Sequence, residues 1–308
     1  MRKLTLTLTM LCALALAGPS PAVAGYTNTQ HPIVLVHGVS GFDTVGGLIN
    51  YFHHIPWNLE RSGATVETVS VSFVNDSWTR GEQLRDYLYS LGGDQFNLIG
   101  HSQGAPTSRV AAHLAPEKVA SVTSVNGVNK GSKVADVLRG VLPPDSAIEG
   151  GVDAIANAVG ELINLLSGSD NPQDGVAALE TLTTPGTNAI NDAVNWAGVN
   201  RHGCGGTNEV VNVGGHDLRF FSWGGDARFT NVLDATDPFL VTTGLVFGGE
   251  DNDGLVSTCS QKLGNVIGVH YDMNHLDAVN HLFGLRSVWT NPVSLYRSHA
   301  NRLKQRGL

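Results

Sequence analysis

The chain has 308 residues, a formal net charge of −8 at pH 7 and a hydrophobic content of 42%, which suits one large domain or two small ones. Its mild acidity and its lack of a basic cluster argue against nucleic acid or an anionic membrane as a partner. Since no linker, repeat or low-complexity block divides it, we expect one domain.

The first 24 residues have the pattern of a secretory signal peptide. Met1-Arg2-Lys3 precede an apolar stretch that is too short to span a membrane, and small residues follow, with cleavage predicted after Ala24. No later apolar run reaches about 18 residues. We therefore expect a secreted protein without a transmembrane segment, folded from residues 25–308. Loss of Arg2 and Lys3 changes its net charge from −8 to −10.

The exported chain keeps two cysteines, Cys204 and Cys259. In an oxidising compartment such an isolated pair is expected to form a disulfide. The closed loop of about 55 residues would be worth roughly 4 kcal/mol in the chain-entropy model. We expect its role to be structural.

The elements expected along the chain alternate between strand and helix. Apolar or β-branched runs predict strands at residues 33–36, 66–74, 96–99 and 119–125, and helical spacing predicts helices at 48–59, 81–91 and 105–114. This alternation is typical of an α/β fold with a mostly parallel sheet and helices on both faces. The chemistry is then expected at the carboxyl ends of the strands.

A different pattern occupies residues 146–169, where apolar side chains recur at steps of three and four. One interpretation is a helix that packs on the core. The other is a movable lid, because Gly150, Gly151 and Gly168 bracket or interrupt the segment and a lid over an apolar pocket needs one apolar face. The pattern leaves both open.

The most informative motif is Gly100-His101-Ser102-Gln103-Gly104, between the strand at 96–99 and the helix at 105–114. Glycines around a serine at a strand-to-helix turn allow the sharp bend that exposes the hydroxyl as a nucleophile. The amide of Gln103, at the start of the helix, is expected to donate to an oxyanion. The loop after the first strand should supply the second donor, the amide of Val39.

A serine nucleophile needs a histidine base and a carboxylate that orients it, in the chain order serine, acid, histidine. Asp253, in a turn, is the best candidate acid and His275 the best candidate base, with His270 and His281 as rivals. The separation of about 22 residues between Asp253 and His275 allows one intervening structural unit. We expect His113 and His299 at the surface.

These residues resemble a known family, the secreted bacterial triacylglycerol lipases of the Pseudomonas type, which have the α/β-hydrolase fold. The resemblance covers almost all of residues 31–304. The motifs that carry it are Gly41-Phe42-Asp43, Arg80-Gly81-Glu82-Gln83-Leu84, Asn97-Leu98-Ile99-Gly100-His101-Ser102, Asn252-Asp253-Gly254-Leu255-Val256 and Met273-Asn274-His275-Leu276-Asp277.

The resemblance implies a triad of Ser102, Asp253 and His275, an oxyanion hole from the amides of Val39 and Gln103, and a disulfide between Cys204 and Cys259. It implies a lid near residues 147–166, within a cap segment at about 130–170. It also implies a dedicated folding chaperone, a foldase, during export through the periplasm.

One structural calcium ion is a further implication of the resemblance. Asp234 and Asp277 would supply carboxylates, and His281 and Leu285 would supply backbone carbonyls, a set of oxygen ligands that suits calcium. Asp277 lies two residues beyond His275. An ion there would therefore fix the loop that carries the candidate base.

The predicted function is hydrolysis of water-insoluble acylglycerols through an acyl-serine intermediate. Within enzymes, the alternative is an esterase of short-chain esters or a polyester depolymerase with the same triad. From another class, the chain would be a non-catalytic lipid-binding protein on a hydrolase scaffold. Ala105, Val128 and Asn129 depart from the family pattern without removing a catalytic group.

Overall fold

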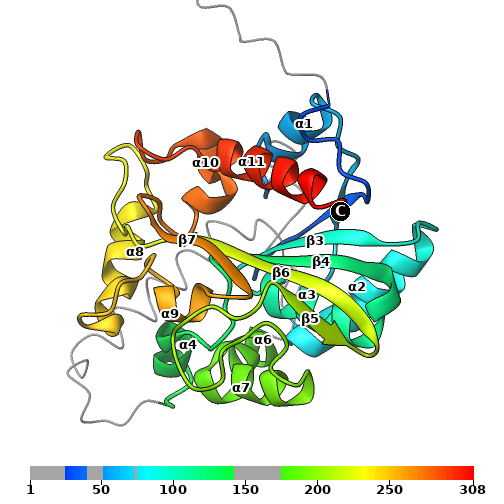
Figure 1. The fold of residues 1–308 in the computed structure, drawn as a ribbon. Helices are drawn as coiled ribbons and strands as arrows, with labels where there is room; N and C mark the ends of the chain where they lie inside the picture. The colour runs from blue at the N-terminus through cyan, green and yellow to red at the C-terminus, as the bar shows by residue number, and fades with distance from the viewer. Residues whose placement is uncertain (1–24, 40–50, 73–74, 142–174) are drawn as a thin grey trace, which may run out of the picture.

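The computed structural model describes residues 25–39, 51–72, 75–141 and 175–308. Its centre is a seven-stranded sheet in the order β2-β1-β3-β4-β6-β5, with β7 also paired to β6 (Figure 1). Every pair is parallel except β5 with β6. The strands are β1 Ile33–Val36, β2 Val66–Val69, β3 Phe96–His101, β4 Val119–Val125, β5 Val210–Val213, β6 His216–Gly225 and β7 Asn265–Tyr271.

Helices cover both faces of this sheet (Figure 1). The helices are α1 Ile55–Glu60, α2 Ser77–Ser90, α3 Gly104–Leu114, α4 Lys133–Leu138, α6 Gly175–Leu182, α7 Thr184–Ala193, α8 Asp237–Gly244, α9 Thr258–Gln261, α10 His281–Gly284 and α11 Pro292–Gln305. In the described parts of the chain, short 3-10 helices lie at Pro116–Lys118, Leu245–Phe247 and Asp277–Val279.

Strand β1 shows how the two faces form separate cores. Val34 and Val36 belong to the apolar cluster that includes α2 and α3. Ile33 and Leu35 belong to the cluster that includes α1 and α11. Successive side chains of a strand point to opposite faces, so a short apolar run with no polar position is what a strand covered on both sides requires.

The fold is the expected α/β fold, with differences at the ends of elements. The helix expected at 81–91 begins earlier, at Ser77, because the side chain of Asp76 caps it by accepting from the amides of Trp78 and Thr79, both at 2.9 Å. Strand β2 ends at Val69, short of the expected 74. No strand was expected in 210–225, where β5 and β6 form a hairpin.

Several expectations fall partly or wholly outside the described residues. These are the signal peptide at 1–24, the start of the helix expected at 48–59, and the amphipathic segment at 146–169 with the lid assigned to it. Cys204 and Cys259 form the expected disulfide. Among the described residues, no helix is long and apolar enough to cross a membrane.

Candidate active site

The turn between β3 and α3 holds Ser102 in a left-handed backbone conformation, with φ of 55°. A non-glycine residue adopts this conformation only where its surroundings enforce it. Here the Ser102 amide donates to the carbonyl of Val125 at 3.1 Å, and a β-carbon added at Gly104 would lie 2.1 Å from the carbonyl oxygen of Val36. Ser102 stays partly exposed between the buried residues His101 and Gln103.

Asp253 and His275 lie together at the carboxyl end of the sheet, both almost fully buried. The Nδ1 atom of His275 is 2.8 Å from Oδ2 of Asp253. The other carboxylate oxygen, Oδ1, accepts from the amides of Leu255 and Val256 at 2.9 and 2.7 Å. Since a carboxylate accepts and does not donate, the neutral imidazole of His275 carries its proton on Nδ1 and its lone pair on Nε2.

Two side chains that the motif analysis did not identify complete the surroundings of Asp253. Asn126, directly after β4, donates to its Oδ2 at 2.7 Å, and Gln261 donates to the same atom at 3.2 Å. The backbone of Asn126 is left-handed, with φ of 44°. The position of Asn126 directly after a parallel strand could have indicated a site residue. Nothing in the sequence, however, indicates that its partner is Asp253.

The other histidines are engaged elsewhere. His270 is exposed and its Nδ1 lies 2.6 Å from Asp226, whereas His281 is buried against Tyr51, with ring centroids 6.0 Å apart. His113 is exposed, as expected. The surface position expected for His299 is wrong: it is fully buried, with Nε2 2.8 Å from the hydroxyl of Thr123, because α11 packs that face onto the sheet.

The loop after β1 lies against the turn at Ser102. A β-carbon added at Gly38 would lie 2.7 Å from Cβ of Ser102. The guanidinium of the buried Arg80 fixes this loop by donating to the carbonyls of His37, at 2.5 Å, and Gly38, at 3.2 Å. It also donates to the side chain of Gln103. Arg80 thus contacts Gln103, whose own amide was expected to donate to an oxyanion, and Gly38, whose carbonyl shares a peptide group with the other expected amide, that of Val39.

Val39, the expected second donor, lies at the end of the described part of this loop and packs beside Val128 and Val256. Burial lowers the pKa of Arg80 to about 10, so it remains charged at neutral pH. Burial, assisted by the charge of Arg80, lowers the pKa of His37 to about 3, so His37 is neutral. The loop therefore lies beside one buried positive charge.

The loop that carries His275 rests on buried carboxylates. Asn274 donates to Oδ1 of Asp237 at 2.7 Å, and its own Oδ1 accepts from the amides of Leu276 and Asp277, both at 2.9 Å. Burial raises the pKa of Asp277 to about 7, and the charge of Asp237 adds to the shift. Asp237 was not among the expected ligands, although it is fully buried.

The residues expected to bind calcium occupy this region. Asp234 is buried and its Oδ1 accepts from the amide and hydroxyl of Thr236, at 2.8 and 2.6 Å. Asp277 is buried, and its Oδ1 has no hydrogen-bond partner among the described residues. His281 begins α10, and Leu285 directly follows it.

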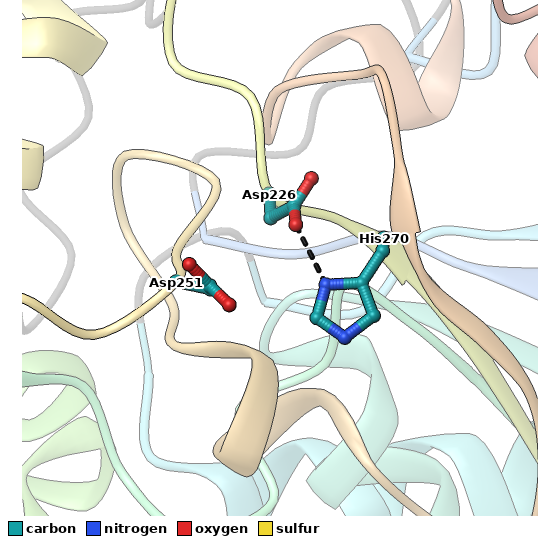
Figure 2. A group of neighbouring side chains, drawn as sticks. All are labelled: Asp226, Asp251 and His270. Carbon is teal, nitrogen blue, oxygen red and sulfur yellow. Dashed lines mark hydrogen bonds and ion pairs between the residues drawn. The ribbon is translucent and has the colours of Figure 1, made fainter.

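A different group of potential metal ligands lies near the end of β6. Asp226, Asp251 and His270 each place one ligand atom within 4.8 Å of the others, the only such group of three among the described residues (Figure 2). Asp251 and His270 are exposed, and His270 already pairs with Asp226. Asp234 and Asp277 form no such group of side chains among the described residues, since the other two expected ligands are backbone carbonyls.

Known proteins with similar sequences and folds identify the fold class of the chain. A family described as the alpha/beta hydrolase fold matches residues 31–148. Two solved structures are similar in fold: a metagenomic carboxyl esterase, with a TM-score of 0.62 and 18% identity over 94% of this chain and 80% of that chain, and a Bacillus licheniformis lipase in mature form, with a TM-score of 0.55 and 19% identity over 85% and 89%.

Curated relatives narrow this class. The chain is 50% identical over 290 residues to a triacylglycerol lipase of Vibrio cholerae, covering 92% of this chain and 91% of the relative. It is 39% identical to one of Pseudomonas fragi, covering 91% and 98%, and 37% identical to one of Burkholderia plantarii, covering 96% and 92%. The chain therefore belongs to the bacterial triacylglycerol lipases, which are carboxylic ester hydrolases of the α/β-hydrolase fold.

Proposed function

We propose that Ser102, His275 and Asp253 form the catalytic triad of this lipase. Ser102 attacks the ester carbonyl while Nε2 of His275 takes its proton, and the same nitrogen then returns the proton to the leaving alcohol. Water repeats the cycle on the acyl-serine and releases the fatty acid. The hydrogen bond between His275 and Asp253 carries this proposal, because it fixes the tautomer that leaves Nε2 able to accept a proton.

The oxyanion of each tetrahedral intermediate is proposed to accept from the amides of Val39 and Gln103. The contacts of Arg80 support this assignment. The carbonyl of Gly38, which accepts from Arg80, belongs to the same peptide group as the amide of Val39. A charged donor on the carbonyl polarises that peptide and strengthens its N–H as a donor.

Water-insoluble acylglycerols are the proposed substrates. Besides the names of the relatives, this rests on exposed apolar side chains in two segments. The side chain of Asn231 joins these segments by donating to the carbonyl of Arg286 at 3.1 Å. Large exposed apolar side chains that gather on a protein surface often contact a partner surface. The two segments expose Phe229, Val232, Leu233, Phe283, Val288 and Trp289, all more than half exposed.

A structural calcium ion is proposed between the carboxylates of Asp234 and Asp277 and the carbonyls of His281 and Leu285. Within the part of the chain that the structure describes, no donor reaches the buried Oδ1 of Asp277. This fits such an ion, because a buried carboxylate oxygen without a donor is costly unless a cation compensates it. When bound, the ion would supply positive charge to a buried acidic site. The residues themselves hold the backbone immediately after His275.

Export through the periplasm with removal of residues 1–24, and assistance by a foldase, are proposed from the family resemblance. Expression of the chain with and without residues 1–24, and with and without the foldase of a relative, tests both. We expect secreted, active enzyme only from the full chain together with the foldase. Equal secretion of active enzyme without either would refute this part of the proposal.

The triad is tested by labelling with a fluorophosphonate, which reacts with an activated serine. Ser102→Ala should lose both labelling and ester hydrolysis while keeping its melting temperature. The control is Ser121→Ala, a buried serine outside the site, which donates to Asn97 within the sheet; it should keep both. Hydrolysis retained by Ser102→Ala would refute the assignment.

A substrate series separates a lipase from an esterase. Rates on esters of increasing chain length should rise once the substrate exceeds its solubility and forms an emulsion. A rate that saturates below the solubility limit, with no gain on the emulsion, would indicate an esterase of soluble esters.

A further inference from the structure

Behind the turn at Ser102, four buried groups form a continuous line of three hydrogen bonds. The amide of Gly38 donates to the hydroxyl oxygen of Tyr51 at 2.9 Å. That hydroxyl lies 2.6 Å from Nδ1 of His101, and Nε2 of His101 lies 2.9 Å from the backbone carbonyl oxygen of His275. Tyr51 is 7% exposed and His101 is 1% exposed, so water has little access to this line.

The amide of Gly38 and the carbonyl of His275, at the two ends of the line, determine the position of each proton between them. A backbone amide can only donate and a backbone carbonyl can only accept. The hydroxyl of Tyr51 therefore accepts from Gly38 and is free to donate its own proton to Nδ1 of His101. His101 then carries its single proton on Nε2 and donates it to the carbonyl of His275. The opposite tautomer would place two lone pairs 2.9 Å apart.

His101 must also stay uncharged for this arrangement to hold. Burial, together with the neighbouring His275, lowers the pKa of His101 well below its ordinary value. The rings of these two histidines lie close, with centroids 4.7 Å apart. A charge on His101 would disfavour the protonated form that a base adopts during catalysis. The hydrogen bond from Tyr51 occupies the only nitrogen of His101 that could accept a second proton.

The line joins three segments that are far apart in the chain. Gly38 belongs to the loop proposed to provide an oxyanion donor, His101 directly precedes the proposed nucleophile, and the carbonyl belongs to the proposed base itself. Ser102 and His275 must hold their relative positions closely, since a displacement of about 1 Å can cost about 10²-fold in rate. The hydrogen bond from His101 fixes the backbone of one relative to the other.

We propose that Tyr51 and His101 are positioning residues, which hold the backbone of His275 in register with Ser102 and the oxyanion loop through a hydrogen-bonded line of fixed proton direction. This role rests on the proposed triad. It assigns a function to the histidine of the Gly-His-Ser-Gln-Gly motif, whose side chain the mechanism does not otherwise use. In this role both side chains act through the backbone carbonyl of His275.

Tyr51→Phe tests the proposal, with Tyr296→Phe as its matched control. Both tyrosines are buried in the same apolar cluster, but the hydroxyl of Tyr296 has no hydrogen-bond partner among the described residues. On a soluble 4-nitrophenyl ester, Tyr51→Phe should lower kcat about 10- to 100-fold with KM within about twofold. Tyr296→Phe should leave both within about twofold of the wild type.

A spectroscopic measurement reports the tautomer without relying on activity. In the ¹⁵N NMR spectrum of the wild type, Nε2 of His101 should be protonated and Nδ1 should not. Tyr51→Phe should shift this population, whereas Tyr296→Phe should not. A proton on Nδ1 in the wild type would overturn the proposal, as would equal kcat values for the two tyrosine variants.

Two substitutions of His101 test whether its hydrogen bond to the carbonyl of His275 matters or only the volume of its side chain. His101→Gln keeps an amide that can donate to the carbonyl of His275, and His101→Leu keeps volume without a donor. At equal melting temperatures, His101→Gln should retain about tenfold more kcat, a difference of about 1.4 kcal/mol. Equal kcat values would overturn the proposal.

Failure of the proposed triad and failure of the positioning role alone give different results. A wild-type protein that does not react at Ser102 with a fluorophosphonate would overturn the triad and, with it, the positioning role. Normal labelling of the wild type with no difference between Tyr51→Phe and Tyr296→Phe would overturn the positioning role alone.

Discussion

Replacement of Arg80 by lysine should reduce both stability and catalysis, although the formal charge is kept. The guanidinium donates to the carbonyls of His37 and Gly38 and to the side chain of Gln103. A single ammonium on a flexible stem cannot reproduce this planar fork. At least one buried carbonyl should therefore lose its donor, and the loop after β1 should lose its fixed position.

The contacts set the size of both effects. Each hydrogen bond from a charged donor contributes about 1.5–3 kcal/mol, so loss of one or both of the contacts to His37 and Gly38 should lower the free energy of unfolding by about 1.5–6 kcal/mol. Complete loss of one oxyanion donor costs about 10²–10³ in kcat. Because the peptide of Val39 would be displaced and not removed, we expect a fall of about 10²-fold, with a smaller change in KM.

Arg109 provides the matched control. It is also a buried arginine, whose contacts are to Asn191 Oδ1 at 2.6 Å and the carbonyl of Ala197 at 3.2 Å, outside the site. Urea unfolding and kcat on a soluble ester should be measured for Arg80→Lys and Arg109→Lys. Both should be destabilised, and only Arg80→Lys should lose kcat. If the two variants kept the same kcat, the proposed link between Arg80 and the oxyanion hole would be refuted.

Asp253, the proposed calcium site and Glu209 each give a further expected outcome. Asp253→Asn should lower kcat about 10⁴-fold, because an amide in place of Oδ2 favours the wrong tautomer of His275; a loss below tenfold would contradict the triad. Chelation of calcium should lower the melting temperature and kcat together, and unchanged values would remove the calcium site. Burial of Glu209 opposes its ionisation, but hydrogen bonds from Arg306, Asn265 and Arg219 outweigh it and lower the pKa of Glu209 to about 2 from 4.5. Ionised Glu209 therefore stabilises the fold fully above about pH 5, and this stabilisation is lost as the pH falls through about 2. In urea unfolding, Glu209→Gln should lower the free energy of unfolding by about 2–3 kcal/mol at pH 7 and by little near pH 2. A loss that does not depend on pH would contradict this.

Local chemistry made part of the site predictable. The turn at Ser102 could be found because its glycines, the preceding apolar strand and the following helix all lie within a few residues of one another. The same reasoning found Asp253 and His275 as candidates but could not separate His275 from His270 and His281. The structure pairs His275 with Asp253, and it engages His270 with Asp226 on the surface.

Sequence patterns did not predict the positions of side chains that depend on packing between distant segments. His299 was expected at the surface from its place in a terminal helix, but α11 lies on the sheet and buries it beside Thr123, Phe221 and Trp223. Arg80 belonged to a family motif without an assigned role. Its position beneath the loop after β1 depends on how α2 packs against the sheet, which no pattern within α2 records.

The sequence alone determined the alternation of strand and helix, the turn at Ser102 and the candidate acid and base, because periodicity and turn chemistry act over a few residues. The family resemblance came from several short motifs in one order along the chain. Only the tertiary structure determined the partners of the buried polar groups: Arg80 with the loop after β1, Asn126 with Asp253, and Tyr51 through His101 to His275. Such pairs join segments up to 174 residues apart. Their cost of desolvation is met only when the packed sheet brings one particular donor to one particular acceptor.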